Sequence, residues 1–301
     1  MSFAINKLAE KITKDSSGQT YWTIKFMVDR DRQQDSFKAY AYLRWIDDQI
    51  DEKLKTEAEC VQFMKRQKQI VQAAYQGSRL PKLVNEEQMV VELIVKNRTN
   101  NPRLKSFVVN FVEVIDFDAG RKNRQVTKEK LEWYSDLVAK AVTDGIMHFI
   151  DHGVQYPATR EKYLAARGAH IAHMLRDMFE DEKEGFINIP GEYLRQHNLK
   201  PLEVDKPEYR LYVREQVELA RKYLGEGKKY IDRLEGLRVK MAAHWYCARF
   251  EPILDVIERD NFRLRQDYDE YKSLKSRWRA IWLAGKLTFR HFVLTRQVSV
   301  L

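Results

Sequence analysis

Two acidic clusters contain the residues whose type and spacing point most directly to chemistry. Asp47 and Asp51 form one pair, and Asp177 and Asp181 form a second pair about half a chain later. On a helix, four-residue spacing places both carboxylates of a pair on one face, about 5–6 Å apart at Cβ. Like charges at that distance repel each other, and a divalent cation would remove the repulsion. Because Mg²⁺ commonly binds one or two carboxylates together with substrate phosphates, the pairs predict two Mg²⁺ sites.

An arginine precedes the acids in both clusters. Arg44 lies three residues before Asp47, and Arg176 lies directly before Asp177. A guanidinium is a planar donor that matches phosphate oxygens. One such cluster would most simply be a solvated acidic face. Two of them, set among apolar residues, predict that a metal-bridged diphosphate is held from two sides of a helical cavity.

The sequence around these clusters resembles the squalene/phytoene synthase family, the head-to-head trans-prenyl transferases. The aromatic segment 40–51 is similar to the family's first motif. Residues 175–181 (Leu-Arg-Asp-Met-Phe-Glu-Asp), followed by Gly-Phe-Ile-Asn-Ile-Pro at 185–190, are similar to the second. Weaker similarities lie at 20–21, 134–139 and 248–255. In the order of the family, the resemblance covers roughly residues 15 to 280.

The resemblance implies an all-α, isoprenoid-synthase-like fold with a central cavity, and an Mg²⁺-dependent enzyme that joins two C15 or C20 prenyl diphosphates. One substrate ionises, and the double bond of the second attacks the allylic cation. The resulting cyclopropylcarbinyl diphosphate ionises again and rearranges. By the same resemblance, the metal-binding and catalytic residues are Asp47, Asp51, Asp177 and Asp181, with Tyr134 and His173 as further catalytic residues. The residues expected to bind substrate are Thr20, Tyr21, Tyr40, Arg44, His170, Arg176 and Phe250. Aromatic rings at Tyr40, Tyr134 and Phe250 would line a pocket for the carbocation.

Several positions depart from the family pattern. Lys140 and Thr143 stand where the family has glycines, so we expect a reshaped or shortened hydrocarbon tunnel, unless Lys140 faces solvent. His170 and His173 replace a glutamine and an asparagine. They would serve as phosphate donors or as a general base, or else be ordinary core histidines. Phe250 lacks an expected hydroxyl. These departures keep two alternatives open: a terpene synthase or cyclase acting on one prenyl diphosphate, and a catalytically silent binding or assembly protein.

Helical periodicity dominates the elements that must position these groups. The residues Leu137, Ala141, Asp144 and His148, for example, fall at three- and four-residue spacing. Breakers cluster at 77–82, 97–103, 153–159 and 185–207. The last stretch is expected to be non-helical and to form a lid or rim of the active site. We predict one all-α domain over residues 1–301, with its core at about 15–280 and an amphipathic tail at 281–301.

Composition excludes several classes of protein. The 301 residues are 44% hydrophobic and 32% charged, which excludes a disordered chain, and 12 Gly and 7 Pro are few for an all-β sandwich. The sequence contains no run of 18 apolar residues, so no transmembrane helix is expected. With only Cys60 and Cys247, no disulfide framework is expected, and a cytoplasmic location is favoured.

The net charge is +9, from 53 basic and 44 acidic residues. The basic residues are dispersed and no nucleic-acid motif is present, so prenyl diphosphate substrates or a membrane surface, and not nucleic acid, are the expected partners. The segment 281–301 is apolar but interrupted by basic residues. It predicts peripheral association with an anionic membrane, or a terminal helix packed on its own domain. Two patterns are weak: Gly225–Lys229 lacks the Walker spacing, and the pair His148 and His152 has no evident third metal ligand.

Overall fold

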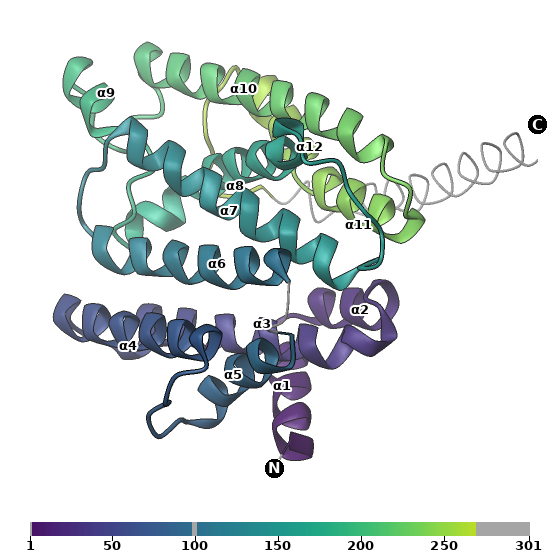
Figure 1. Ribbon diagram of the computed structural model, residues 1–301. Helices are drawn as coiled ribbons and strands as arrows, with labels where there is room; N and C mark the ends of the chain where they lie inside the picture. The colour runs from purple at the N-terminus through teal and green to yellow at the C-terminus, as the bar shows by residue number, and fades with distance from the viewer. Residues whose placement is uncertain (1, 98–100, 269–301) are drawn as a thin grey trace, which may run out of the picture. The chain divides into compact units, whose positions relative to one another are not determined.

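The computed structural model describes residues 2–97 and 101–268, and the regular elements of this part of the chain are helices (Figure 1). No β-strand occurs within it. In the same residues, one isolated parallel bridge joins Arg124 to Phe186. The prediction of an all-α fold is confirmed. In the described residues, no helix is both long and apolar enough to cross a membrane. The predicted tail at 281–301 lies outside the described residues.

The chain divides into two compact units. The first comprises Met1–Lys122 and Lys140–Gly153, and the second comprises Asn123–Ala139 and Val154–Leu301. Helix α7 (Lys128–Phe149) therefore contributes its beginning to the second unit and its end to the first. The expected single domain stays a prediction.

The first unit is built around helix α3 (Gln33–Asp48), which packs against α1, α2, α5 and α6. Phe37, Tyr42 and Ile46 on α3 are almost fully buried. The 3₁₀-helix η1 precedes α3, and the π-helix η2 follows it directly. The other elements of this unit are α1 (Ser2–Ser16), α2 (Gly18–Met27), η1 (Arg30–Arg32), η2 (Gln49–Lys53), α4 (Glu57–Gln76), α5 (Asn85–Asn97) and α6 (Pro102–Arg121).

A buried polar network ties α3 to α4 and α5. The hydroxyl of Tyr42 donates to Gln67 Oε1 (3.2 Å), and Gln67 Nε2 donates to Glu87 Oε1 (3.0 Å). Arg66 donates two hydrogen bonds of 2.8 Å to the Glu87 carboxylate. Burial alone would raise the pKa of Glu87, but the bonds from Arg66 and Gln67 outweigh it and lower the pKa. The charged form is thus held in place beneath α3.

The helix ends in this unit follow ordinary capping chemistry. Ser17 caps α2 by accepting a hydrogen bond from the Thr20 backbone N–H (3.2 Å). Thr56 and Glu59 form a capping box at the start of α4. Gly77 ends α4 with φ +69°, a left-handed conformation that glycine adopts without steric cost. The loop predicted from the breakers at 77–82 is therefore present.

The second unit is built on the pairing of α8 (Leu164–Lys183) with α10 (Pro207–Asp232). Small residues allow the close approach. A Cβ on Gly227 would lie 2.2 Å from the backbone nitrogen of Ala165, and one on Gly168 would lie 2.8 Å from the carbonyl oxygen of Ala220. Besides the beginning of α7, the unit contains η3 (Arg160–Tyr163), α9 (Gly191–Gln196), α11 (Leu237–Ala248) and α12 (Glu251–Arg259).

Two sequence patterns take their meaning from this unit. Gly225–Lys229 lies inside α10, so it is helix and not a phosphate-binding loop. The stretch 185–207, expected to be non-helical, contains the short helix α9 at Gly191–Gln196, so that expectation is wrong in part. The role of this stretch as a lid or rim stays a prediction.

Candidate active site

The first aspartate pair spans a change of helix type. Asp47 lies in the last turn of α3, whereas Asp51 lies in the π-helix η2. Each backbone hydrogen bond of a π-turn joins residues five apart in the chain instead of the four of an α-helix, and such turns are frequent at functional sites. The pair therefore does not sit on one continuous α-helical face, as four-residue spacing had predicted. Both side chains are accessible, since 44% of the Asp47 side chain is exposed and Asp51 is exposed as well.

Arg44 is brought to the acids of this motif as predicted, but its partners are Asp47 and Asp48. Its Nη1 lies 3.2 Å from Asp47 Oδ2, and its Nη2 lies 2.5 Å from Asp48 Oδ1. Burial opposes the charge on Arg44, but Asp48 and Asp47 outweigh this effect and raise its pKa. Asp48 was not among the predicted site residues. Its spacing of four residues from Arg44 on the same helix is the signal that identifies it.

The second pair lies on the last turns of α8. Arg176 donates from Nη2 to Asp177 Oδ2 (2.5 Å) and from Nε to Asp177 Oδ1. His173 Nδ1 lies 3.2 Å from Asp177 Oδ2. Asp181 accepts a hydrogen bond from Asn188 Nδ2 (2.6 Å). Helix α8 thus brings Arg176, His173 and Asp177 together, so that a bound phosphate would have to share the Arg176 guanidinium with the Asp177 carboxylate.

Asn188 is a site residue that sequence reasoning missed. It is buried, lies after the end of α8, and its backbone carbonyl accepts a hydrogen bond from the Tyr212 hydroxyl (3.2 Å). The turn that carries Asn188 is fixed to α8, because the Phe186 N–H donates to the Asp181 carbonyl (2.7 Å). The signal available in the sequence was the turn at 185–190, which resembles part of the family's second motif and contains Asn188.

The two histidines differ in their surroundings. His170 is buried, with Nδ1 3.1 Å from the Ser135 hydroxyl and its ring 5.1 Å from that of Tyr134. In contrast, 48% of the His173 side chain is accessible, and its ring lies 6.1 Å from that of Phe250. Desolvation by the surrounding protein lowers the pKa of His173, although the Asp177 carboxylate opposes the shift.

The aromatic candidates of the second unit are buried. Tyr134 is on α7, and Phe250 lies at the start of α12, where its ring is 5.3 Å from that of Tyr246. The ring of Tyr134 is therefore a neighbour of His170, and the ring of Phe250 is a neighbour of His173. Their role in facing a carbocation stays a prediction.

The remaining substrate-binding candidates belong to the first unit. The Thr20 hydroxyl accepts a hydrogen bond from Ser17 (2.9 Å) at the start of α2. Tyr21 donates to Glu10 Oε1 (3.3 Å), and its ring lies 5.7 Å from that of Phe37. Tyr40 is half-buried on α3, one turn before Arg44. Contact of these three residues with a substrate stays a prediction.

The two departures on α7 differ in their exposure. The Lys140 side chain is exposed, as a solvated helix face requires, and whether it lines the mouth of a tunnel stays a prediction. Thr143 is buried, and its effect on a tunnel stays a prediction.

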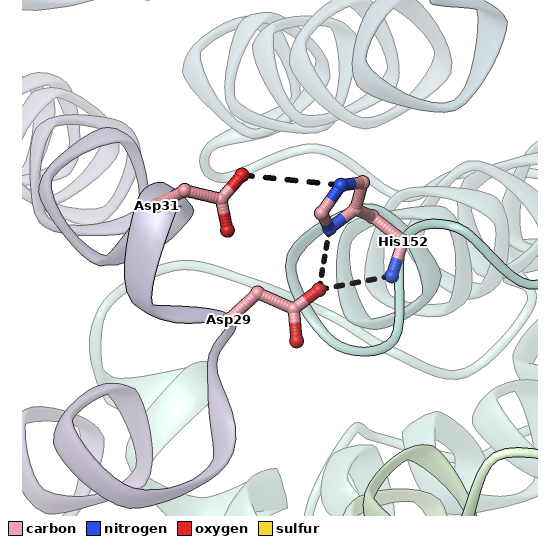
Figure 2. Close-up of side chains that lie close together, drawn as sticks. All are labelled: Asp29, Asp31 and His152. Carbon is pink, nitrogen blue, oxygen red and sulfur yellow. Dashed lines mark hydrogen bonds and ion pairs between the residues drawn. The ribbon is translucent and has the colours of Figure 1, made fainter.

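A separate group of ligand-type side chains lies in the first unit. Of the described residues, only Asp29, Asp31 and His152 form a group of three whose possible ligand atoms all lie within 4.8 Å of one another (Figure 2). Asp29 accepts hydrogen bonds from the backbone N–H groups of Asp151 (3.2 Å) and His152 (3.0 Å), and its Oδ2 lies 2.5 Å from His152 Nδ1. Because these bonds satisfy the turn after α7, we interpret the group as a structural tether.

His148 does not join that group. Its Nε2 lies 2.9 Å from Nη1 of Arg32, a cation that disfavours a bound metal. The weak pattern formed by His148 and His152 is therefore not a shared metal site.

The chemistry of the aspartate pairs fits Mg²⁺, since accessible carboxylate oxygens are the hard ligands this ion takes. As far as the structure describes the chain, neither pair by itself makes a three-ligand group. Two carboxylates are enough for Mg²⁺, because this ion completes its coordination with phosphate and water. The Asp47 pair belongs to the first unit and the Asp177 pair to the second. Their predicted approach across a cavity stays a prediction.

The chain has the isoprenoid-synthase-like all-α fold, which it shares with solved squalene and dehydrosqualene synthases. The family model for squalene/phytoene synthases matches residues 13–280. The chain therefore belongs to the squalene/phytoene synthase family.

Solved structures share the fold at low sequence identity. A squalene synthase, HpnC, from Alicyclobacillus acidocaldarius has a TM-score of 0.66 and 17% identity, and the alignment covers 87% of this chain and 96% of that one. A dehydrosqualene synthase in complex with a ligand has a TM-score of 0.68 and 17% identity, covering 96% of this chain and 97% of that one. No curated protein sequence matches the chain.

Proposed function

We propose that this protein is an Mg²⁺-dependent prenyl transferase that condenses two C15 or C20 prenyl diphosphates head-to-head. The family match over residues 13–280 supports the reaction class. The observation that carries the proposal is the presence, in a chain so distant from its structural relatives, of both aspartate pairs with an arginine against each. Arg44 contacts Asp47, and Arg176 contacts Asp177.

The reaction requires that diphosphate depart, and its developing negative charge must be neutralised. Mg²⁺, when bound, would neutralise part of that negative charge. Asp47 and Asp51 would hold one site for the ion, and Asp177 and Asp181 a second. The guanidinium groups of Arg44 and Arg176 would donate to phosphate oxygens, each from a side chain already positioned by its carboxylate partner.

The carbocation left behind needs a dry, electron-rich surrounding. The rings of Tyr134 and Phe250 would provide it, since aromatic faces attract cations. Both are buried, and each lies next to an imidazole. His170 or His173 would accept the proton that the final cation loses when no reductant supplies a hydride.

The test is incubation of the purified protein with farnesyl or geranylgeranyl diphosphate and Mg²⁺, followed by mass spectrometry of the products. We expect C30 or C40 hydrocarbons that disappear with EDTA and return with added Mg²⁺. Asp47→Asn and Asp177→Asn should reduce turnover by at least about a hundredfold. The matched control Asp31→Asn removes an exposed carboxylate of the tether and should remain active.

The alternatives give different results in the same assay. C15 or C20 terpenes would identify a synthase or cyclase that uses one substrate. Absence of any turnover, with both aspartate pairs intact, would favour a binding or assembly protein. Turnover in EDTA would remove Mg²⁺ from the account.

A further inference from the structure

Helices α1 and α2 carry the most exposed large apolar side chains of the described chain. Phe26 is 72% exposed, Phe3 71% and Trp22 56%. Single exposed apolar residues are normal on a protein surface, but Trp22 and Phe26 are neighbours on α2, and their rings stack 5.5 Å apart. Two adjacent aromatic rings exposed to solvent indicate a surface that a binding partner covers.

Helix α1 has two opposite faces. Ile5, Ala9 and Thr13 follow one another at four-residue spacing and are buried. At the opposite side of the helix, an exposed stripe runs through Phe3, Lys7, Lys11 and Lys14 at spacings of four, four and three residues. An aromatic residue at one end followed by three lysines is a basic amphipathic pattern.

The stripe keeps part of its positive charge. Lys11 forms an ion pair with Asp15, at 2.5 Å. Lys7 and Lys14 lie instead over aromatic rings, those of Phe3 (4.5 Å) and Tyr21 (5.8 Å). These two ammonium groups are therefore available to attract a negatively charged surface.

Helix α2 repeats the division into two faces. Ile24 and Met27 are buried, and Trp22 and Phe26 lie on the outward side. The ring of Tyr21 connects the two helices, because it lies 5.1 Å from Trp22 and beneath Lys14. Trp and Phe combined with Lys are the side chains that helices lying in a membrane interface present to lipid.

We propose that Phe3, Trp22 and Phe26, with Lys7 and Lys14, form a lipid-binding surface that docks the first unit on an anionic bilayer. The rings would enter the headgroup region, and the two lysines would contact acidic lipid headgroups. This surface is distinct from the segment 281–301 and does not depend on the reaction proposed above. If the substrates carry prenyl tails, docking would place the enzyme where they dissolve.

The experiment is flotation of the intact protein with vesicles of phosphatidylcholine alone or mixed with phosphatidylserine. We expect binding to the mixed vesicles that weakens in high salt. Phe3→Ser/Trp22→Ser/Phe26→Ser should lower the partition coefficient about tenfold or more, and Lys7→Glu/Lys14→Glu should remove the preference for phosphatidylserine. Trp245→Ser, which replaces another exposed tryptophan, is the matched control and should bind like wild type. Because all the replaced residues are exposed, the helical circular dichroism should not change.

Three results would overturn the proposal. One is equal partition of wild type and the triple serine variant. Another is a loss of binding caused only by Lys286→Glu/Arg290→Glu, which would assign lipid contact to 281–301. The third is absence of vesicle binding together with a concentration-dependent dimer that the triple serine variant abolishes, because a second copy would then cover the rings.

Discussion

His148 should make the stability of the protein depend on pH in a defined window. The residue is 2% exposed near the end of α7, with Nε2 2.9 Å from Nη1 of Arg32. An imidazole nitrogen that faces a guanidinium N–H must be an unprotonated acceptor. Burial first, and then the charges of Arg32, His152 and Arg103, lowers the pKa of His148 from its ordinary 6.5 to about 3.

The sign of the effect follows from proton linkage. Between these two pKa values the unfolded chain binds a proton that the folded chain does not, so the free energy of unfolding falls as the pH falls. The contribution of His148 to the free energy of unfolding is fully present above about pH 6.5 and is progressively lost toward about pH 3. Each pH unit in this window corresponds to about 1.4 kcal/mol, so His148 should cost about 2 kcal/mol between about pH 7.5 and 5.

The assay is urea unfolding followed by circular dichroism over this pH range for wild type, His148→Gln and His148→Phe. Glutamine preserves an acceptor for Arg32 and phenylalanine does not, so the two variants will differ in absolute stability. Neither can titrate, so both should lack the same part of the pH dependence, about 2 kcal/mol by about pH 5. Parallel curves for all three proteins would refute the reasoning, because His148 would then not be held neutral by the fold.

Three further changes test the packing and the site. Gly227→Ala should destabilise the protein by about 2 kcal/mol or more in urea unfolding, because its Cβ would meet the Ala165 backbone. In the control Gly225→Ala, the Cβ has no atom within 4 Å, so this variant should stabilise the protein by about 0.5–1 kcal/mol. Equal effects of the two changes would argue against close packing of α8 and α10. Glu87→Gln should cost roughly 2 kcal/mol through weakened bonds from Arg66, and an unchanged midpoint would contradict the network. Asn188→Ala should lower kcat more than thermal stability, since it removes one hydrogen bond that positions the Asp181 carboxylate, and Asn188→Gln should restore part of the loss. A drop in melting temperature without a kinetic effect would make Asn188 purely structural.

Local patterns were enough to predict most of the helices and the placement of the pair Asp177 and Asp181 on one of them. Apolar spacing along 137–148 corresponds to α7, and the glycine at 77 ends α4. Arg44 and Arg176 were predicted because their partners are at most four residues away, where helix geometry alone decides the contact. These features depend on a few consecutive residues, which is the range over which sequence periodicity carries information.

The features that were missed depend on contacts between distant segments or on small changes of backbone geometry. Asp29 meets the turn at 151–152 from more than a hundred residues away, and no local pattern encodes that pairing. Asn188 reaches Asp181 only because the chain turns back after α8. The π-helix at Gln49–Lys53 alters the register between Asp47 and Asp51, although the sequence continues the helical pattern. Whether Lys140 lines a tunnel likewise depends on which face of α7 the rest of the protein covers, and local spacing does not encode this.

The most direct test of the central claim is a labelling experiment with an equal mixture of unlabelled and fully deuterated prenyl diphosphate. If the protein joins two substrates head-to-head, mass spectrometry will show unlabelled, half-labelled and fully labelled hydrocarbons, and the half-labelled species will disappear together with the other two in Asp47→Asn and Asp177→Asn. A product that occurs only in unlabelled and fully labelled form would contradict the claim, because each product molecule would then derive from a single prenyl diphosphate.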